Sequence, residues 1–227
     1  MVLLTLKMDS QRIPERIEGE LLDRCLERGF YRMQQDMFTT NLIIQEESVM
    51  PVHWLRTRLS LFNHNSTTKE ILRKNKKFSA EIRPFLYSVE LEDLFSLYKT
   101  GISFTPSASV ASYLFEDEKQ HRFNTWMIQL RDRGLLIGTG IFDVGMNSIA
   151  GIMNIYHPDY KKHSIGKWLM LQKMEFAKSI GAEFYYTGYI SPGTPRFDYK
   201  LFPSRDCIEI WNPDAEVWFP YNLFPVK

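Results

Sequence analysis

Residues 156–199, YHPDYKKHSIGKWLMLQKMEFAKSIGAEFYYTGYISPGTPRFDY, decide the fold of this chain. A helix is predicted to begin at Ser164 or Ile165, with the Ser164 side chain capping its first turn, and to end at Gly181. Its core stripe is formed by apolar residues at helical spacing, namely Ile165, Leu169, Phe176 and Ile180. Residues 183–190 are aromatic and β-prone, so the stretch reads as strand, helix, strand. This order predicts a crossover unit whose helix N-terminus could hold an anion.

The segments before this unit predict more strands and helices. A hairpin is expected over 125–142 and a third strand over 148–156. The further expectations are helices within 14–32, at 69–74, 91–100 and 110–115, and strands at 38–45 and 52–61. We therefore expect an α+β protein with a mixed sheet flanked by helices, in the element order of the GNAT (acyl-CoA N-acyltransferase-like) fold. Residues 85–227 would form this domain, and residues 1–84 a smaller N-terminal α+β lobe.

Composition limits the class of protein. The 227 residues are 44% hydrophobic and 14% aromatic, which indicates a folded globular chain. Two distant cysteines, Cys25 and Cys207, indicate neither a disulfide framework nor a cysteine metal site. His157 and His163 have no carboxylate pattern around them, so no metal site is expected. With no signal-peptide pattern and no apolar run of about 20 residues, we expect a soluble, cytoplasmic protein that does not bind membranes.

Positive charge is concentrated in one segment. The formal net charge is only +1, but residues 51–84 hold eight basic and two acidic residues, a local charge of 8 − 2 = +6. Such a segment could bind a polyanion, although a solvated, Lys-rich helix surface would look the same. The candidate residues for binding a polyanion in this segment are Arg56, Arg58, Arg73, Lys74, Lys76 and Lys77.

A set of short motifs, in order, resembles the C-terminal domain of the arginyl-tRNA–protein transferases, also called aminoacyl-tRNA–protein transferases. The residues that carry the resemblance are Gly140–Val144, Tyr156–Tyr160, Ser164–Gly166, Tyr185–Ile190, Tyr199–Lys200 and the closing Trp218–Pro220. The N-terminal half resembles the family more loosely, at residues 21–32 and 72–75.

The resemblance implies an enzyme that moves an amino acid, arginine or similar, from charged tRNA to the N-terminal amine of an acceptor protein. Aminoacyl-tRNA and acceptor proteins would be its partners, and it would need no cofactor. A coenzyme-A-dependent GNAT N-acyltransferase, using acetyl-CoA or another acyl-CoA, is the alternative. A non-catalytic tRNA- or protein-binding module is a third reading. The sequence leaves the oligomeric state open.

Two departures from the family pattern bear on the substrates. Gln34–Met37 and Met50–Pro51 stand where the family has paired cysteines, so no role of those thiols carries over. The family's run before its Tyr-Lys pair is basic, whereas here Asp198 follows Arg196 at a two-residue spacing. On a strand these two side chains would share a face and partly neutralise each other.

The chemistry calls for an amine-binding carboxylate, donors for the developing oxyanion and a basic tRNA surface. Asp143, after an apolar run, is the candidate carboxylate, although it could be a turn residue before Gly145. Ser164 and Gly166 could hold the tRNA 3′ end, or simply cap the helix. The other candidates are Tyr189 and Tyr199 as catalytic residues and Tyr186, Thr187, Arg196, Asp198 and Lys200 as substrate-binding residues; the strand aromatics among them could equally be core.

Overall fold

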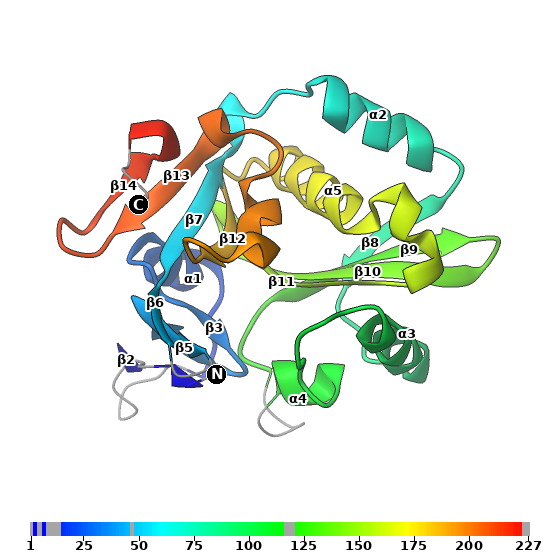
Figure 1. The fold of residues 1–227 in the computed structure, drawn as a ribbon, viewed down its shortest axis with the longest axis horizontal. Helices are drawn as coiled ribbons and strands as arrows, with labels where there is room; N and C mark the ends of the chain where they lie inside the picture. Colours follow the sequence, from blue (N-terminus) through cyan, green and yellow to red (C-terminus); the bar gives the residue numbers. More distant parts are fainter. Residues whose placement is uncertain (1, 4–5, 8–14, 46–47, 116–120, 224–227) are drawn as a thin grey trace.

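One sheet of eight strands organises the molecule (Figure 1). The computed structural model describes residues 2–3, 6–7, 15–45, 48–115 and 121–223. The strand order is β14-β13-β7-β12-β11-β10-β9-β8. In chain order these strands are β7 (His53–Arg58), β8 (Ser79–Pro84), β9 (Thr125–Asp132), β10 (Leu135–Val144), β11 (Ser148–Tyr156), β12 (Phe184–Ile190), β13 (Ile208–Asn212) and β14 (Val217–Pro220).

The predicted crossover lies in the middle of this sheet. β9 and β10 form the expected hairpin, and β11 adds antiparallel to β10. The chain then passes through η3 (Pro158–His163) and α5 (Ile165–Ser179) before β12 pairs with β11 in parallel. The other neighbouring strand pairs of the sheet are antiparallel. The expected α+β class, with a mixed sheet and a strand–helix–strand unit, is confirmed.

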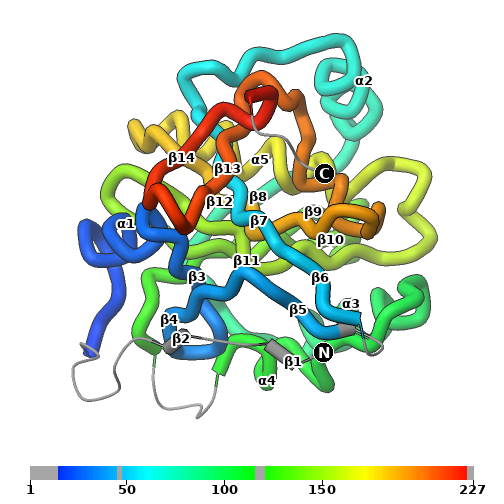
Figure 2. Tube along the Cα trace, turned by 60° about the vertical axis from the view of Figure 1, so that its left-hand side comes forward, coloured from blue at the N-terminus to red at the C-terminus, as the bar shows by residue number. Residues whose placement is uncertain are grey.

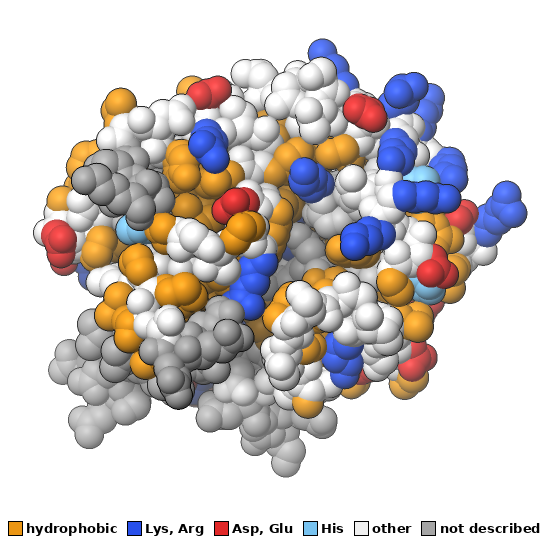
Figure 3. Space-filling view, in the orientation of Figure 1, with side chains coloured by type: hydrophobic (Ala, Val, Ile, Leu, Met, Phe, Trp, Pro, Cys, Tyr) orange, Lys and Arg blue, Asp and Glu red, His pale blue; other side chains and the backbone are white. Residues whose placement is uncertain are grey.

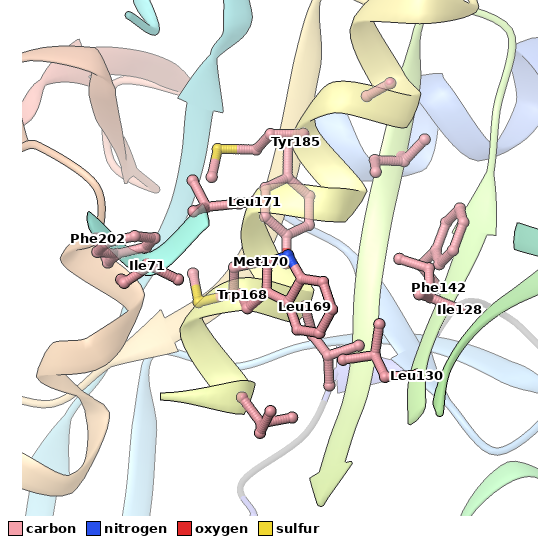
Figure 4. Packing of buried hydrophobic residues seen from close by; sticks show 14 of the residues in the cluster. Ile71, Ile128, Leu130, Phe142, Trp168, Leu169, Met170, Leu171, Tyr185 and Phe202 are labelled. Carbon is pink, nitrogen blue, oxygen red and sulfur yellow. The ribbon is translucent and has the colours of Figure 1, made fainter. Parts of the chain in front are cut away.

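Helices cover both faces of the sheet. α5 and α2 (Ser66–Asn75) lie on one face, and α3 (Val89–Thr100) and α4 (Val110–Leu114) lie on the other (Figures 1 and 2). α1 (Gly19–Glu27) packs with Trp54, Tyr186 and Trp211 from the strands of the β7 side. Figure 4 shows the main core, where Trp168 to Leu171 of α5 lie among Ile71, Phe142, Tyr185 and Phe202.

Two small sheets and several 3-10 helices complete the fold. One sheet joins β1 (Val2–Leu3), β5 (Leu42–Gln45) and β6 (Ser48–Pro51); the other joins β2 (Leu6–Lys7), β4 (Asp36–Thr39) and β3 (Tyr31–Met33). Besides η3, the described 3-10 helices are η2 (Leu59–Leu61), η4 (Pro195–Leu201), η5 (Arg205–Cys207) and η6 (Tyr221–Leu223). β7 and β8, which precede residue 85, belong to the eight-stranded sheet. The division of the chain at residue 84 stays a prediction.

Several local expectations were wrong. The predicted strand 38–45 is two strands in different sheets, because the Thr40 hydroxyl and the Leu42 backbone make a turn between them. α2 begins at Ser66, before the predicted start at residue 69, because Asn65 caps it: its Oδ1 accepts from the Thr68 N–H at 2.9 Å. Ile180 lies beyond the end of α5 and is 42% exposed, so it does not extend the core stripe.

The start of α5 also differs from the prediction. Ser164 does precede the helix, but its backbone is left-handed (φ 53°) and its side chain makes no capping hydrogen bond. None of the helices in the described ranges is long and apolar enough to cross a membrane.

Candidate active site

The parallel strands β11 and β12 separate soon after they meet, and a cavity lies between them. Only three residue pairs are in register, ending at Ala150 and Tyr186. A bulge interrupts each strand at this point: β11 shifts register against β10 near Ile152, and β12 shifts against β7 at Thr187. The cavity is about 310 Å³, and residues 150–154 and 187–189 form its sheet walls. Figure 3 shows this face of the molecule hollowed near its centre.

Aromatic side chains make up much of the remaining wall. Tyr31 and Trp54 stack with their ring centroids 3.8 Å apart, and Tyr189 meets Trp54 edge-on at 5.1 Å. The Tyr31 hydroxyl donates to the Leu55 carbonyl and the Trp54 indole to the Thr40 carbonyl, so both rings are fixed. The other aromatic lining residues are Phe38, Phe104, Tyr113, Tyr185, Phe197 and Tyr199. The cavity can therefore hold an apolar group against rigid rings.

The charged groups that line the cavity are all cationic. Arg32, Lys173 and Lys200 contribute to the wall, whereas the described lining residues include no Asp or Glu. Such a wall favours carboxylates and partial negative charge over cationic groups.

Lys173 lies on α5 with its side chain against the sheet and is 1% exposed. Its Nζ donates to the carbonyls of Ile141 (2.8 Å) and Met153 (3.2 Å), the pair next to the β11 bulge. Gly140 makes room for it, because a Cβ there would lie 3.0 Å from Lys173 Cε. Burial lowers the pKa of Lys173 to about 7, against an opposing effect of Asp143.

Lys200 reaches the cavity from η4 and is half-buried. Its Nζ donates to the Tyr189 carbonyl at 2.8 Å and lies 4.7 to 5.9 Å from the rings of Tyr189, Phe197 and Tyr199. Gly188 (φ 96°) leaves space for this ammonium, since a Cβ would approach it to 3.2 Å. Burial, with Arg196 nearby, lowers the pKa of Lys200 to about 7.

Asp143, the predicted carboxylate, is sealed behind Arg32. It is fully buried, and its Oδ1 accepts from Arg32 (2.8 Å) and from the Thr125 hydroxyl (2.6 Å). Arg32 also donates to the carbonyls of Gln34 and Leu114. Burial raises the pKa of Asp143, and the Arg32 guanidinium opposes the rise. Arg32 lines the cavity and Asp143 does not, so the carboxylate does not face an incoming amine directly.

The other predicted site residues divide into two groups. Tyr189, Tyr199, Thr187 and Lys200 line the cavity, and the buried Thr187 hydroxyl has no hydrogen-bond partner in the described protein. The residues that do not line it are Ser164, Gly166, Tyr186, Arg196 and Asp198.

Tyr186 and the η4 residues differ from their expected surroundings. Tyr186 is 2% exposed and meets the Arg56 guanidinium through its hydroxyl, at 3.4 Å. Arg196 and Asp198 lie on the 3-10 helix η4 and not on a strand, so the argument that they share a strand face was wrong. Both side chains are exposed beside Phe197, which does line the cavity.

The six residues predicted to bind tRNA also differ in their exposure. Arg73, Lys74, Lys76 and Lys77 are exposed on α2 and the turn after it. Arg56, in contrast, is 8% exposed and donates to Glu209 at 2.6 Å. Arg58 donates to the same carboxylate, so both arginines hold β7 to β13. The exposed surface that the prediction needs is absent at Arg56, and the Arg58 guanidinium is held by the same carboxylate. We therefore leave both arginines out of the set.

A second basic segment lies next to α2. The Asn75 side chain donates to the His163 carbonyl at 2.9 Å and joins α2 to η3, where Lys161 and Lys162 are exposed. Burial and the charges of Lys77, Lys162 and Lys74 lower the pKa of His163. Figure 3 shows these cations gathered over α2 and η3. We name Arg73, Lys74, Lys76, Lys77, Lys161 and Lys162 the basic face.

Sequence reasoning missed Arg32 and Lys173. A helix lysine is usually solvated, but Lys173 follows Met170 and precedes Ala177 at spacings of three and four, on a buried face. That spacing was the available signal. Among the described residues, no group of three or more His, Cys, Asp or Glu is placed to hold a metal ion.

Comparison with known proteins gives a family and several distant relatives. Residues 63–202, more than half of the chain, match the family model described as "Arginine-tRNA-protein transferase, C terminus". An aspartate/glutamate leucyltransferase of Leptospira interrogans is 23% identical over 83% of this chain and 74% of its own length. One from Pseudomonas fluorescens is 26% identical over 64% of this chain and 63% of its own length.

Solved structures match more weakly. FemX gives a TM-score of 0.43 at 9% identity, over 84% of this chain and 64% of its own. A GCN5-related N-acetyltransferase from Kribbella flavida gives 0.39 at 11% identity, over 96% of this chain and 65% of its own. The chain thus spans less than two thirds of these structures and of the Pseudomonas relative.

Proposed function

Because the chain belongs to the family of arginine-tRNA-protein transferases, we propose that it moves an amino acid from charged tRNA to the N-terminal amine of a protein. Its partners would be aminoacyl-tRNA and acceptor proteins, in the cytoplasm. The observation that carries the proposal is the cavity between β11 and β12, which has rigid aromatic walls and no Asp or Glu among its described lining residues. It has the size and chemistry to hold a single amino-acid residue beside an acceptor end.

The cavity favours an apolar amino acid over arginine as the transferred group. An arginine side chain would need a carboxylate partner once desolvated, and the described lining offers none. The rings of Tyr31, Trp54 and Tyr189 suit a leucine-sized side chain instead. The name of the Leptospira relative, a leucyltransferase, agrees with this choice.

The same wall favours acceptors that begin with Asp or Glu. Arg32 is held in place by Asp143 and lines the cavity, where its positive charge would attract a carboxylate. Lys200 lies across the cavity, above Tyr189 and Tyr199. Asp143 thus has a positioning role for Arg32 in our proposal, in place of direct amine binding.

Binding of tRNA is proposed for the basic face. It gathers exposed lysines and an arginine from α2 and η3, and η3 leads directly into the start of α5 at Ser164 and Gly166. The ribose or terminal phosphate of the 3′ end would pass this helix entry on its way to the cavity. Phosphate contacts of this kind make affinity fall steeply with salt.

One assay tests the transfer. The protein is incubated with a mixture of charged tRNAs and peptides that begin with Asp, Glu, Lys or Arg, and products are identified by mass. We expect leucine on the Asp and Glu peptides. A parallel reaction with acetyl-CoA tests the GNAT alternative, and acetylation without aminoacyl transfer would overturn the proposal.

A second assay tests the basic face. Affinity for tRNA is measured over a salt series for the wild type and for the double variant Arg73→Glu/Lys77→Glu. We expect weaker binding and a shallower salt slope in the variant. Lys178→Glu, on the exposed end of α5, is the matched control; equal slopes for all three proteins would exclude the basic face as the docking surface.

A further inference from the structure

The cavity needs a group that can accept a proton, and Asp143 does not face it. An N-terminal α-ammonium has a pKa near ~8 and is not a nucleophile until it loses a proton. Asp143 is enclosed by Arg32 and Thr125, on the face of the sheet opposite α5. Lys173 is the buried cationic residue of the cavity wall for which the structure gives carbonyl partners only.

The hydrogen bonds of Lys173 match a neutral amine. A neutral amine has two N–H groups, which suit the carbonyls of Ile141 and Met153, and one lone pair that remains for the cavity. An ammonium would present a third N–H, and Lys173 makes no third hydrogen bond with the described part of the chain. Asn154 Oδ1, beside it on the cavity wall, is a buried acceptor with no partner in the described protein.

The groups around Lys173 leave it without a charge partner. β10 contributes the Phe142 ring, 5.8 Å from Nζ, and Asp143, which is paired with Arg32 through Oδ1. Asp143 makes no hydrogen bond to Lys173, but its charge raises the pKa of Lys173 against the larger effect of burial. The one titratable residue of β11 is Tyr156, at its end, and β12 offers the buried Tyr185. The titratable groups across the cavity are Tyr31, Arg32, Tyr113, Tyr189, Tyr199 and Lys200. Burial without a paired carboxylate favours the neutral amine near neutral pH.

We propose that Lys173 is the base of the transfer reaction: its Nζ takes a proton from the α-ammonium of the acceptor protein. This inference rests on the proposed function and adds a residue to it. Its grounds are the position of Lys173 in the cavity wall, the two carbonyl acceptors of its Nζ and the absence of a carboxylate among the described lining residues.

The reaction balances with the groups named. The acceptor ammonium gives one proton to Lys173, and the resulting amine attacks the ester carbonyl carbon of the aminoacyl-tRNA. The new C–N bond forms as the C–O bond to the terminal ribose breaks. The attacking nitrogen then carries two protons: it keeps one in the amide and releases the other to solvent. The ribose oxygen leaves as a hydroxyl with the proton supplied by the Lys173 ammonium, which returns Lys173 to its neutral form. No oxidant, reductant or further reactant is needed.

Other groups in the wall fit this role less well. Lys200 has a similarly lowered pKa, but its Nζ lies against three aromatic rings, which attract the ammonium form. Burial raises the pKa of Tyr189, which disfavours the phenolate. Arg32 cannot release a proton at these pH values.

Direct titration of Lys173 tests the proposal without any substrate. Wild-type protein with isotope-labelled lysines is followed by NMR from about pH 5 to 10, and the Lys173 signal is assigned by its loss in Lys173→Met. We expect a midpoint near the lowered pKa of about 7. A lysine that stays protonated above about pH 9 would overturn the proposal, whatever the enzyme transfers.

Single-turnover transfer with wild type and Lys173→Met then tests the role. General-base loss predicts a rate about 100-fold lower. The rising limb of the pH profile should also move from near 7 to ~8, the pKa of the free α-amine. Lys178→Met, on the exposed end of the same helix, is the control and should match the wild type.

The two assays separate the two failures. If Lys173→Met is folded by thermal unfolding and keeps the wild-type rate and profile, Lys173 is not the base. If wild type transfers nothing from any charged tRNA, the proposed function is wrong, while the NMR midpoint still shows whether a neutral lysine faces the cavity.

Discussion

The two kinds of buried cation in this protein differ in their partners. Arg32 and Arg56 each meet a buried carboxylate, Asp143 and Glu209, at 2.8 and 2.6 Å. Lys173, equally buried, donates to backbone carbonyls only. The arginine pairs fix segments that are far apart in the sequence, such as β3 to β10 and β7 to β13. The unpaired lysine faces the cavity between β11 and β12.

The difference in partners indicates different roles for the buried arginines and for Lys173. A buried ion pair is rigid and keeps both groups charged, so it suits a positioning role. A buried lysine without a carboxylate partner has a lowered pKa and can change its protonation near neutral pH. The arginine pairs therefore belong to the scaffold, whereas Lys173 has the properties that our proposed reaction needs.

Breaking the Arg32–Asp143 pair gives the largest expected change in stability. Arg32→Met would leave the buried Asp143 without its charge partner and lower the free energy of unfolding by about 3–5 kcal/mol. Urea unfolding at neutral pH measures it. Arg56→Met is the matched comparison, and its loss should be smaller because Glu209 keeps Arg58. A larger loss for Arg56→Met would mean that the scaffold role lies mainly on the β7 side.

Removing Lys173 should change how stability depends on pH. The unfolded lysine holds its proton up to about pH 10.4, whereas the folded one releases it at about 7. Unfolding in this window takes up a proton, so a rise in pH stabilises the folded state by about 1.4 kcal/mol per unit. Lys173→Met should lose this slope between about pH 7 and 10.

The measurement is the free energy of unfolding of both proteins at several pH values. Lys178→Met, at an exposed position of α5, should keep the wild-type slope. If the curves of unfolding free energy against pH are parallel for wild type and Lys173→Met, the folded Lys173 does not release its proton between about pH 7 and 10. Lys173 would then stay charged like the buried arginines.

The smallest expected effect concerns Asp198, which is exposed on η4 near the cavity. Asp198→Arg should raise kcat/KM for peptides that begin with Asp or Glu over those that begin with Lys or Arg. An exposed charge contributes about 1 kcal/mol or less, so the shift should be at most about fivefold. Asp214→Arg, exposed between β13 and β14, is the control. An unchanged ranking in Asp198→Arg would limit Asp198 to a structural role.

Sequence reasoning reached the crossover unit because its signals are local. One stretch of chain contains all of these signals: the helical spacing after Ser164, Gly181 at the end of the helix, and the aromatic run 184–190. The partners of buried charges are not local: Arg32 meets Asp143 across 111 residues, and Arg56 meets Glu209 across 153. Asp143 therefore looked available for an amine, and Arg56 looked like a surface cation. Lys173 was missed because its burial depends on tertiary structure: α5 packs over the point where β11 and β12 separate, and a single stretch of sequence does not show this.

The most direct test of the central claim is where the aminoacyl group binds. A charged-tRNA analogue with a stable amide in place of the ester, and a photoreactive diazirine leucine, is irradiated with the full chain, and adducts are located by mass spectrometry. We expect adducts within residues 150–154 or 185–189, where β11 and β12 separate, and we expect them to disappear when unmodified leucyl-tRNA competes. Adducts confined to the basic face or to β14, with none in these two ranges, would contradict it.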